Sequence, residues 1–309
     1  MRRSAATVRW LLFAGLLAAP VHAQTIDDGI MLEKRGLLTG TLYTHDTWDE
    51  YWEGARKRDN GNIGTLTTRT GVWFGNYALT RRLNLIAMVP HVRTRASRGV
   101  LHDQSGFQDL TVAAKYSVLE ASATPVGTVR AIAVVAAGLP MTDYTPDFYP
   151  LSIGSHSRRL STRGTLHVQT EPGFFASGSG AYTLRSTVTL DRPYYFTENR
   201  LFLTDEVDMP NVFDYVVSAG FMRRRLMAAA MFSQQRTLGG GDIRRQDMPF
   251  VSNRMNFSKV GGLVMAPLPK LENLVVQLGY TFTIAGRNVG QSSSVTAGLL
   301  FQFRGRQVQ

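Results

Sequence analysis

The sequence lacks cysteine, lacks convincing helical periodicity after its N-terminal segment, and has no long apolar run. The missing cysteine excludes disulfide frameworks, cysteine metal sites and thiol chemistry. The longest apolar run after the N-terminal segment, Ala131–Leu139, falls well short of the ~20 residues that a transmembrane helix needs. These absences leave β-strands as the main structural element that the sequence can encode.

Residues 1–23 have the organisation of an export signal. Arg2 and Arg3 precede the apolar run Trp10–Ala19, and Val21-His22-Ala23 places small residues at the −3 and −1 positions of a cleavage site. We predict a cleaved signal peptide, 1–23, followed by one domain, 24–309. An uncleaved anchor is the alternative, but the apolar run is only about half the length of a spanning helix.

The stretch 273–303 shows the repeating pattern that dominates the rest of the chain. Apolar side chains occupy every second position, and mostly small or polar residues such as Gln277 stand between them. A period of two sends the two sets to opposite faces of a strand. Runs of about ten residues exceed the usual strand of about 5–6 and match the 9–11 that a tilted strand needs to cross a bilayer. A soluble, exported β-sandwich is the alternative.

Similar runs are expected throughout the chain, separated by connections of alternating length. The predicted strands are 38–45, 65–75, 83–95, 107–119, 126–139, 160–169, 174–196, 213–222, 226–234, 256–266 and the closing pair. The predicted short turns are 76–82, 119–125, 223–225 and 267–272, and the predicted long loops are 45–64, 96–106, 140–159, 205–211 and 237–254. Glycines in the linker 286–290 are expected to provide the positive φ of a tight turn.

Outer-membrane barrels have short periplasmic turns and long outer loops, and a closed barrel satisfies its backbone hydrogen bonds inside lipid. We therefore predict an all-β fold, a closed antiparallel transmembrane β-barrel of twelve strands, with fourteen as the alternative. Its expected location is the outer membrane of a Gram-negative bacterium. Twelve strands favour a narrow or plugged interior over a broad aqueous pore.

No motif for catalysis or cofactor binding is evident. Gly239-Gly240-Gly241 lacks the lysine and the strand–helix context of a phosphate loop, and the histidines do not have metal-ligand spacings.

The formal net charge of +11 suits an anionic membrane face, anionic solutes or nucleic acid, but an exported chain does not normally meet nucleic acid. We expect no catalytic residue, metal, cofactor or nucleic-acid partner; a barrel enzyme acting on lipid or peptide is the third-ranked functional alternative.

Three polar residues are candidates for lining the lumen and setting its selectivity: Asp109, Lys115 and Gln277. Asp109 and Lys115 are predicted to share one face of the strand 107–119. One hypothesis places them in a charged ladder that constrains solute passage. The other is that such charges fill and stabilise a narrow barrel.

The run Gly106–Tyr116 resembles the G-x-x-D-L-x-x-x-x-K-Y strand of an outer-membrane family of proposed transporters linked to the meta-pathway of phenol degradation. Tyr77–Leu85 and Gly286–Gly290 are similar to other parts of that family. The resemblance implies a β-barrel and passive uptake of small hydrophobic or aromatic solutes; a non-conducting envelope or binding barrel is the alternative. The expected partners are a small-molecule solute, outer-membrane lipid and lipopolysaccharide, and the barrel assembly machinery.

Overall fold

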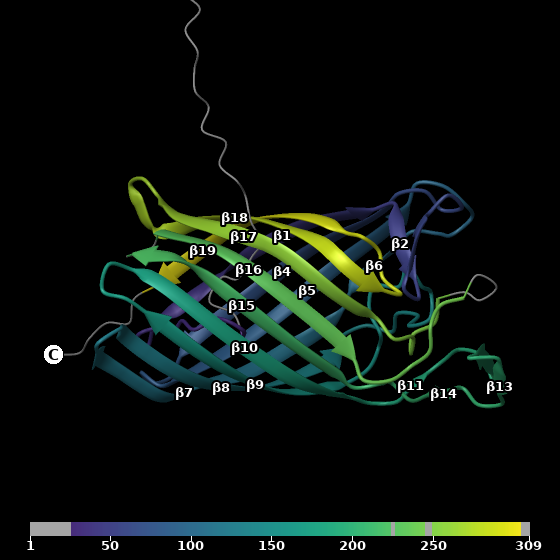
Figure 1. Ribbon diagram of the computed structural model, residues 1–309, viewed down its shortest axis with the longest axis horizontal. Helices are drawn as coiled ribbons and strands as arrows, with labels where there is room; N and C mark the ends of the chain where they lie inside the picture. Colours follow the sequence, from purple (N-terminus) through teal and green to yellow (C-terminus); the bar gives the residue numbers. More distant parts are fainter. Residues whose placement is uncertain (1–25, 224–225, 245–248, 304–309) are drawn as a thin grey trace, which may run out of the picture.

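The computed structural model describes residues 26–223, 226–244 and 249–303, so the predicted signal peptide lies outside the described residues. Twelve strands of the described chain pair with their neighbours into one closed antiparallel barrel (Figure 1). In order around the wall they are β1 (Leu37–Trp48), β4 (Leu66–Ala78), β5 (Leu83–Ala96), β7 (Asp109–Thr124), β8 (Gly127–Pro140), β9 (Arg159–Gln169), β10 (Phe174–Arg185), β15 (Val212–Arg223), β16 (Leu226–Thr237), β17 (Asn256–Leu268), β18 (Leu271–Arg287) and β19 (Ser293–Phe303). The prediction of a closed twelve-stranded barrel is confirmed.

Seven short strands lie at one end of the barrel, among its long connections (Figure 1). They are β2 (Glu50–Glu53), β3 (Arg56–Asp59), β6 (Gln104–Phe107), β11 (Val188–Thr189), β12 (Tyr195–Thr197), β13 (Arg200–Phe202) and β14 (Glu206–Val207). None of the described residues forms a helix with the length and apolar character that crossing a membrane requires.

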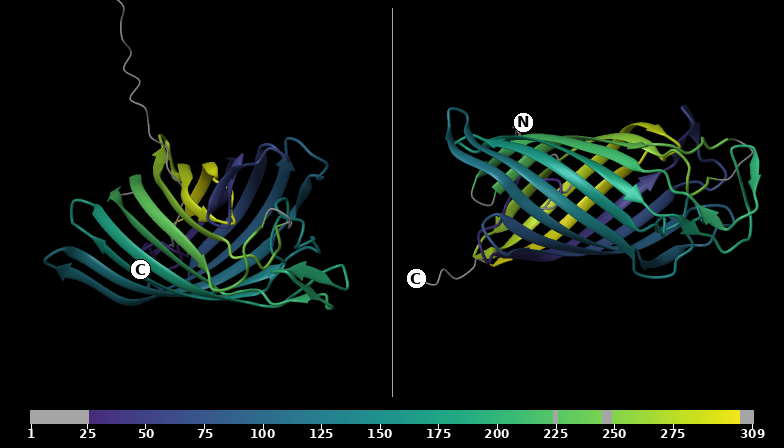
Figure 2. Two further views of the ribbon diagram at one scale, coloured as in Figure 1. Left: turned by 45° about the vertical axis from the view of Figure 1, so that its right-hand side comes forward. Right: turned by 90° about the horizontal axis from the view of Figure 1, so that it is seen from below.

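The first and last wall strands close the barrel. β1 pairs with β19 from Leu37↔Phe303 to Thr47↔Ser293, and a hydrogen bond of 2.8 Å joins the hydroxyls of Thr44 and Thr296 across the seam. Closure leaves no strand edge unpaired, which a sheet inside lipid requires. The strands are inclined to the long axis of the barrel, as Figure 2 shows.

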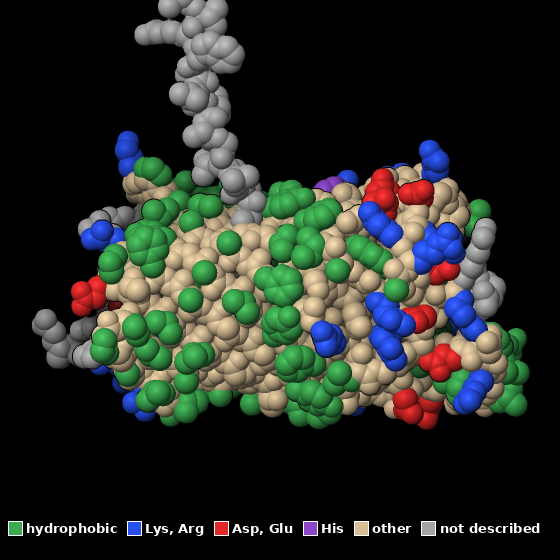
Figure 3. All heavy atoms as spheres, viewed as in Figure 1, with side chains coloured by type: hydrophobic (Ala, Val, Ile, Leu, Met, Phe, Trp, Pro, Cys, Tyr) green, Lys and Arg blue, Asp and Glu red, His purple; other side chains and the backbone are tan. Residues whose placement is uncertain are grey.

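The two-residue alternation decides which side chains face out. In the closing pair, Leu278 and Leu299 are each 45% exposed, whereas Gln277 and Leu300 are completely buried. Hydrophobic side chains cover the barrel wall, and charged side chains gather at its ends, most of them at the end that carries the loops (Figure 3). The apolar row of the closing hairpin faces outward and forms part of an apolar belt suited to lipid.

Short turns lie at one end of the barrel and long loops at the other (Figure 1). The described turns 79–82, 125–126, 170–173 and 269–270 are short. We call their end the turn end and the opposite end the loop end. Two segments differ from their predictions. β7 continues to Thr124 through most of the predicted turn 119–125. The wall strand within 174–196 ends at Arg185, and the loop that follows runs from 186 to 211 rather than from 205 to 211.

The turn between β18 and β19 also differs from its prediction. Its positive φ belongs to Asn288, at 56°, and not to Gly286 or Gly290. A Cβ atom on Gly286 would come within 2.4 Å of the Trp52 ring, and one on Gly290 within 2.3 Å of the Trp48 ring. Glycine is therefore needed here because Trp48, at the end of β1, and Trp52, in β2, lie directly on the backbone.

Candidate functional site in the barrel interior

Residues 26–36 are not part of the wall; their first portion, 26–32, lies inside the barrel. Ile26 and Met31 pack against a cluster of inward side chains from β5, β7 and β8. Leu32 belongs to a larger buried cluster on the other strands of the wall. That cluster comprises Leu32, Leu38, Phe74, Ala78, Phe175, Met227, Leu263, Met265, Val275 and Leu300. The segment therefore contacts β5, β7 and β8 on one side and most other wall strands on the other, so it occupies the middle of the lumen.

Lys115, predicted to face the lumen, fixes this segment. Its side chain is completely buried, and its Nζ donates a hydrogen bond of 2.7 Å to Oδ1 of Asp28, whose side chain is only 8% exposed. Gly29, the residue after Asp28, lies so close to the imidazole of His167 that a Cβ atom on Gly29 would approach the ring to 2.2 Å. A cavity of about 30 Å³ remains between the segment and the wall, room for one or two water molecules. The segment is closely docked.

At the turn end, most side chains that line the lumen are apolar, although Glu33, Arg223 and Gln302 are among them. A cavity of about 1110 Å³ opens there, lined by the segment from Ile30 to Glu33 and by wall side chains that include Met222, Met227, Met265 and Val275. The inward faces of β16 and β17 contribute Met227, Leu263 and Met265 instead of the serines, threonines and glycines of other strands. Polarity of the inner face therefore varies along the barrel.

Asp109 lies near the loop end, away from Lys115. It is 2% exposed and accepts hydrogen bonds from the Tyr144 hydroxyl at 2.5 Å and from Nη2 of Arg159 at 2.9 Å. Burial, assisted by the neighbouring Asp109 carboxylate, raises the pKa of Tyr144, so its hydroxyl keeps the proton that it donates. The same hydroxyl accepts a hydrogen bond from the backbone N–H of His156. Asp109 thus ties the loop 141–158 to the wall.

Further polar side chains form a layer inside the loop half of the barrel. Arg163 pairs with Asp214 and donates to the Ser179 hydroxyl at 2.6 Å. Lys259 donates to the Ser292 hydroxyl at 3.1 Å. Buried charges are tolerated in such a layer because each has a partner of opposite charge or a hydrogen-bonding group.

The three candidates from the sequence are all buried and inward-facing, but the structure does not bring them together. Asp109 pairs with Arg159 and Lys115 with Asp28, so the two residues do not form one ladder. Gln277 is completely buried on β18, and neither atom of its amide group bonds to a described residue. Sequence reasoning missed Asp28, because no periodicity marks a residue that lies outside every strand.

The loops pack together over the loop end. Leu151, completely buried, joins Ile63 and Leu66, and its carbonyl accepts a hydrogen bond from the Thr94 hydroxyl at 2.5 Å. In a second cluster, the ring of Tyr195 stacks on Phe202 at 4.9 Å and on Phe250 at 5.1 Å between centroids. The mouth is therefore covered by loops with apolar cores of their own.

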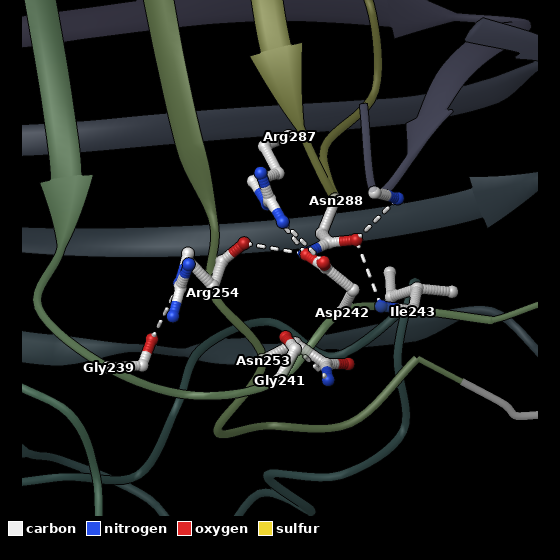
Figure 4. A network of polar contacts seen from close by, with 9 residues as sticks. Gly239, Gly241, Asp242, Ile243, Asn253, Arg254, Arg287 and Asn288 are labelled. Carbon is white, nitrogen blue, oxygen red and sulfur yellow. Dashed lines mark hydrogen bonds and ion pairs between the residues drawn. The ribbon is translucent and has the colours of Figure 1, made fainter. Parts of the chain in front are cut away.

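Asn288 connects three of these loops (Figure 4). Its Oδ1 accepts hydrogen bonds from the N–H of Gly54 at 2.8 Å and of Ile243 at 2.9 Å, and its Nδ2 donates to Asp242 at 2.9 Å. Arg287 donates two further hydrogen bonds to Asp242, at 2.7 and 2.5 Å. This donation holds the pKa of the Asp242 carboxyl below its usual range. We call Asp242, Arg287 and Asn288 the loop latch.

Within the described part of the chain, no group of three or more histidine, aspartate and glutamate side chains could hold a metal ion.

Solved structures with this fold include bacterial outer-membrane proteins. An outer-membrane channel from Pseudomonas putida F1 aligns with a TM-score of 0.70 and 16% identity, over 90% of this chain and 100% of that chain. The translocator domain of the autotransporter NalP from Neisseria meningitidis aligns with a TM-score of 0.44 and 12% identity, over 89% and 90%. The toluene transporter TbuX from Ralstonia pickettii aligns with a TM-score of 0.36 and 14% identity, over 89% and 90%. The first similarity shows that the fold is that of an outer-membrane barrel.

A search of curated proteins finds no match. A family model does match, over residues 60–298, and its description is "Putative MetA-pathway of phenol degradation". The matched range runs from the first loop to the last wall strand and includes the strand Gly106–Tyr116 that carries the sequence resemblance. The chain belongs to this family of outer-membrane β-barrels linked to phenol degradation.

Proposed function

We propose that the barrel gives small hydrophobic or aromatic molecules a passive route across the outer membrane. The observation that carries the proposal is the cavity of about 1110 Å³ that opens at the turn end and is lined mainly by apolar side chains. Its methionines are flexible and polarizable, which suits ligands of varied shape and aromatic rings. The family's link to phenol degradation agrees with such a solute.

The segment 26–32 has to move, at least locally, for a solute to pass, because it occupies the middle of the lumen. Lys115 would control this step through its ion pair with Asp28, and Asp109 would control the position of the loop 141–158 through Tyr144 and Arg159. Gln277 would supply a polar amide on the inner face of the wall, at β18. Diffusion down a concentration gradient requires neither cofactor nor energy source, and we assign no reaction to the barrel.

Uptake by intact cells tests the proposal, because small aromatic molecules cross simple phospholipid vesicles unaided. Cells that produce the barrel should take up radiolabelled phenol or toluene faster than cells that lack it. Met265→Gln places a polar amide in the apolar cavity and should slow uptake several-fold. Met255→Gln, the same substitution in an outer loop away from the cavity, should have no effect. Equal uptake with and without the barrel would refute the proposal.

A non-conducting barrel that supports the envelope or binds a partner through its loops is the second candidate. The docked segment inside the lumen favours it. Planar bilayers distinguish the two functions when combined with the uptake assay. Neither conductance nor solute flux would be expected from a non-conducting barrel.

The proposed location and partners follow from the same fold. A barrel with an apolar outer belt belongs in the outer membrane, where it contacts lipid and lipopolysaccharide. Its insertion would require the barrel assembly machinery.

A further inference from the structure

A row of basic side chains crosses three neighbouring strands on the outside of the barrel. His45 on β1 lies directly opposite Arg69 on β4, and Arg69 lies directly opposite Arg93 on β5. Arg69 is exposed, and the side chain of Arg93 is 56% exposed between the buried residues Val92 and Thr94. Opposed residues in a sheet have Cβ atoms about 4.5–5.5 Å apart. The three groups therefore share one small patch of the outer wall.

The charge of this patch is poorly compensated by the protein itself. Arg95, two residues beyond Arg93, adds a guanidinium whose side chain is 71% exposed. One carboxylate, that of Asp103, lies 3.3 Å from Nη2 of Arg93 and 3.9 Å from Nε of Arg95. Arg69 forms no ion pair with any residue that the structure describes. Like charges directly opposed on a sheet are destabilising unless an anion lies between them.

The patch lies where a bilayer changes from hydrocarbon to headgroups. Between Ala78, at the turn end of β4, and Arg69, the tilted strand climbs roughly 23 Å, close to the ~25 Å apolar belt of such barrels. In the next row toward the turn end, Tyr43 lies opposite Gly71, and Gly71 lies opposite His91, whose ring contacts Phe107 edge-on at 5.2 Å between centroids. Aromatic rings at that level are typical of a membrane interface. The arginines stand just above them, at the loop end.

We propose that His45, Arg69, Arg93 and Arg95 form a binding site for the phosphate groups of lipopolysaccharide in the outer leaflet. Guanidinium groups bind phosphate with paired, charge-assisted hydrogen bonds, and the loop end of an outer-membrane barrel faces that leaflet. The bound phosphates neutralise the opposed arginines, and the acyl chains lie along the apolar wall below them. The site lies on the outside of the wall and is independent of solute passage through the lumen.

Lipid binding to the purified full-length barrel in detergent tests this site. The probes are lipid A with its phosphates, lipid A without them, and phosphatidylglycerol. The unmodified protein should bind phosphorylated lipid A at least tenfold more tightly than either of the others. This comparison requires no variant. Equal binding of the two forms of lipid A would mean that only acyl chains are recognised, and tighter binding of phosphatidylglycerol would mean a different lipid; either result overturns the proposal.

Substitutions then locate the site. Arg69→Gln combined with Arg93→Gln should weaken binding of phosphorylated lipid A at least tenfold, while heat-modifiable migration on gels confirms that the barrel is folded. Arg236→Gln is the matched control, because Arg236 is an exposed arginine at the loop end of β16. It should change binding less than twofold. An equal loss in both variants would indicate diffuse charge attraction and overturn the site.

Discussion

Lys115 is completely buried, and its partner Asp28 belongs to the segment inside the lumen and not to a strand of the wall. Removing one member of a buried ion pair costs about 3–5 kcal/mol, because the remaining charge loses its compensation. We expect Lys115→Met to release residues 26–32 from the lumen and to raise the conductance measured in planar bilayers. Lys57→Met removes a lysine from an exposed pair with Glu50 in the first loop and should leave conductance unchanged.

Two further variants check that undocking is the cause. Gly29→Val creates a clash with the His167 ring without changing any charge, and it should raise conductance in the same way. Adding Asp28→Asn to Lys115→Met removes the carboxylate charge that Lys115 no longer neutralises, and this should restore part of the docking. If Lys115→Met conducts like the unmodified protein, this pair does not hold the segment in place.

The same residue shows what sequence reasoning can provide at this scale. Alternation along the strand was enough to predict that Lys115, Asp109 and Gln277 face the interior, since the period of two fixes the face of each residue. It could not identify their partners. Asp28 is 87 positions away from Lys115 and lies in no strand, so only the folded barrel brings the two together.

At the scale of elements, the wall strands were predictable because each buries one face and exposes the other. β18 and β19 pair from Leu274↔Phe301 to Phe282↔Ser293 within the predicted hairpin. The prediction failed across 174–196, where apolar residues continue past the end of β10. Tyr195 belongs to the buried core of the outer loops, together with Val188, Leu190, Val207 and Phe250. A packed loop needs apolar residues too, and these imitate the signal of a strand.

The loop latch, Asp242, Arg287 and Asn288, makes the outer loops sensitive to acid. The pKa of Asp242 is lower in the folded protein than the value of about 3.9 in an unfolded chain. Its stabilising contribution is therefore complete above about pH 4 and is lost as the pH falls through the folded value. We expect the amides of Gly54 and Ile243, which both donate to Asn288, to remain protected from hydrogen exchange down to about pH 4 and to lose protection below it.

Two substitutions separate the latch from general acid effects. Asp242→Asn should reduce protection of these amides already at pH 7 and remove the step in acid. Asp103→Asn, at an exposed pair elsewhere on the loop end, should leave the profile as it was. Protection that survives in Asp242→Asn, with the same acid step, would assign the pH response to another group.

At the scale of the whole molecule, polar and apolar side chains are distributed differently on the inner and outer faces of the barrel. The outer wall is apolar over its middle and charged at its ends, as a membrane requires (Figure 3). The interior is polar toward the loops and apolar at the turn end, where the segment 26–32 and the methionines line a cavity. This apolar end is the part of the interior on which the proposed passage of apolar solutes depends. Composition could not predict it, because the methionines occupy positions that a wet lumen would fill with polar residues.

The position of the barrel in the membrane leads to a prediction along a single strand. Leu278 lies half-way along β18 and is 45% exposed on its outer face, and Ile284 lies on the same face near the loop end. A lysine at the midplane of the bilayer costs roughly 2–4 kcal/mol, and one near the interface about 0–1 kcal/mol. Leu278→Lys should therefore lower the free energy of unfolding in bilayers by that larger amount, and Ile284→Lys should change it little. Equal effects at both positions would mean that the apolar belt does not lie across the middle of β18.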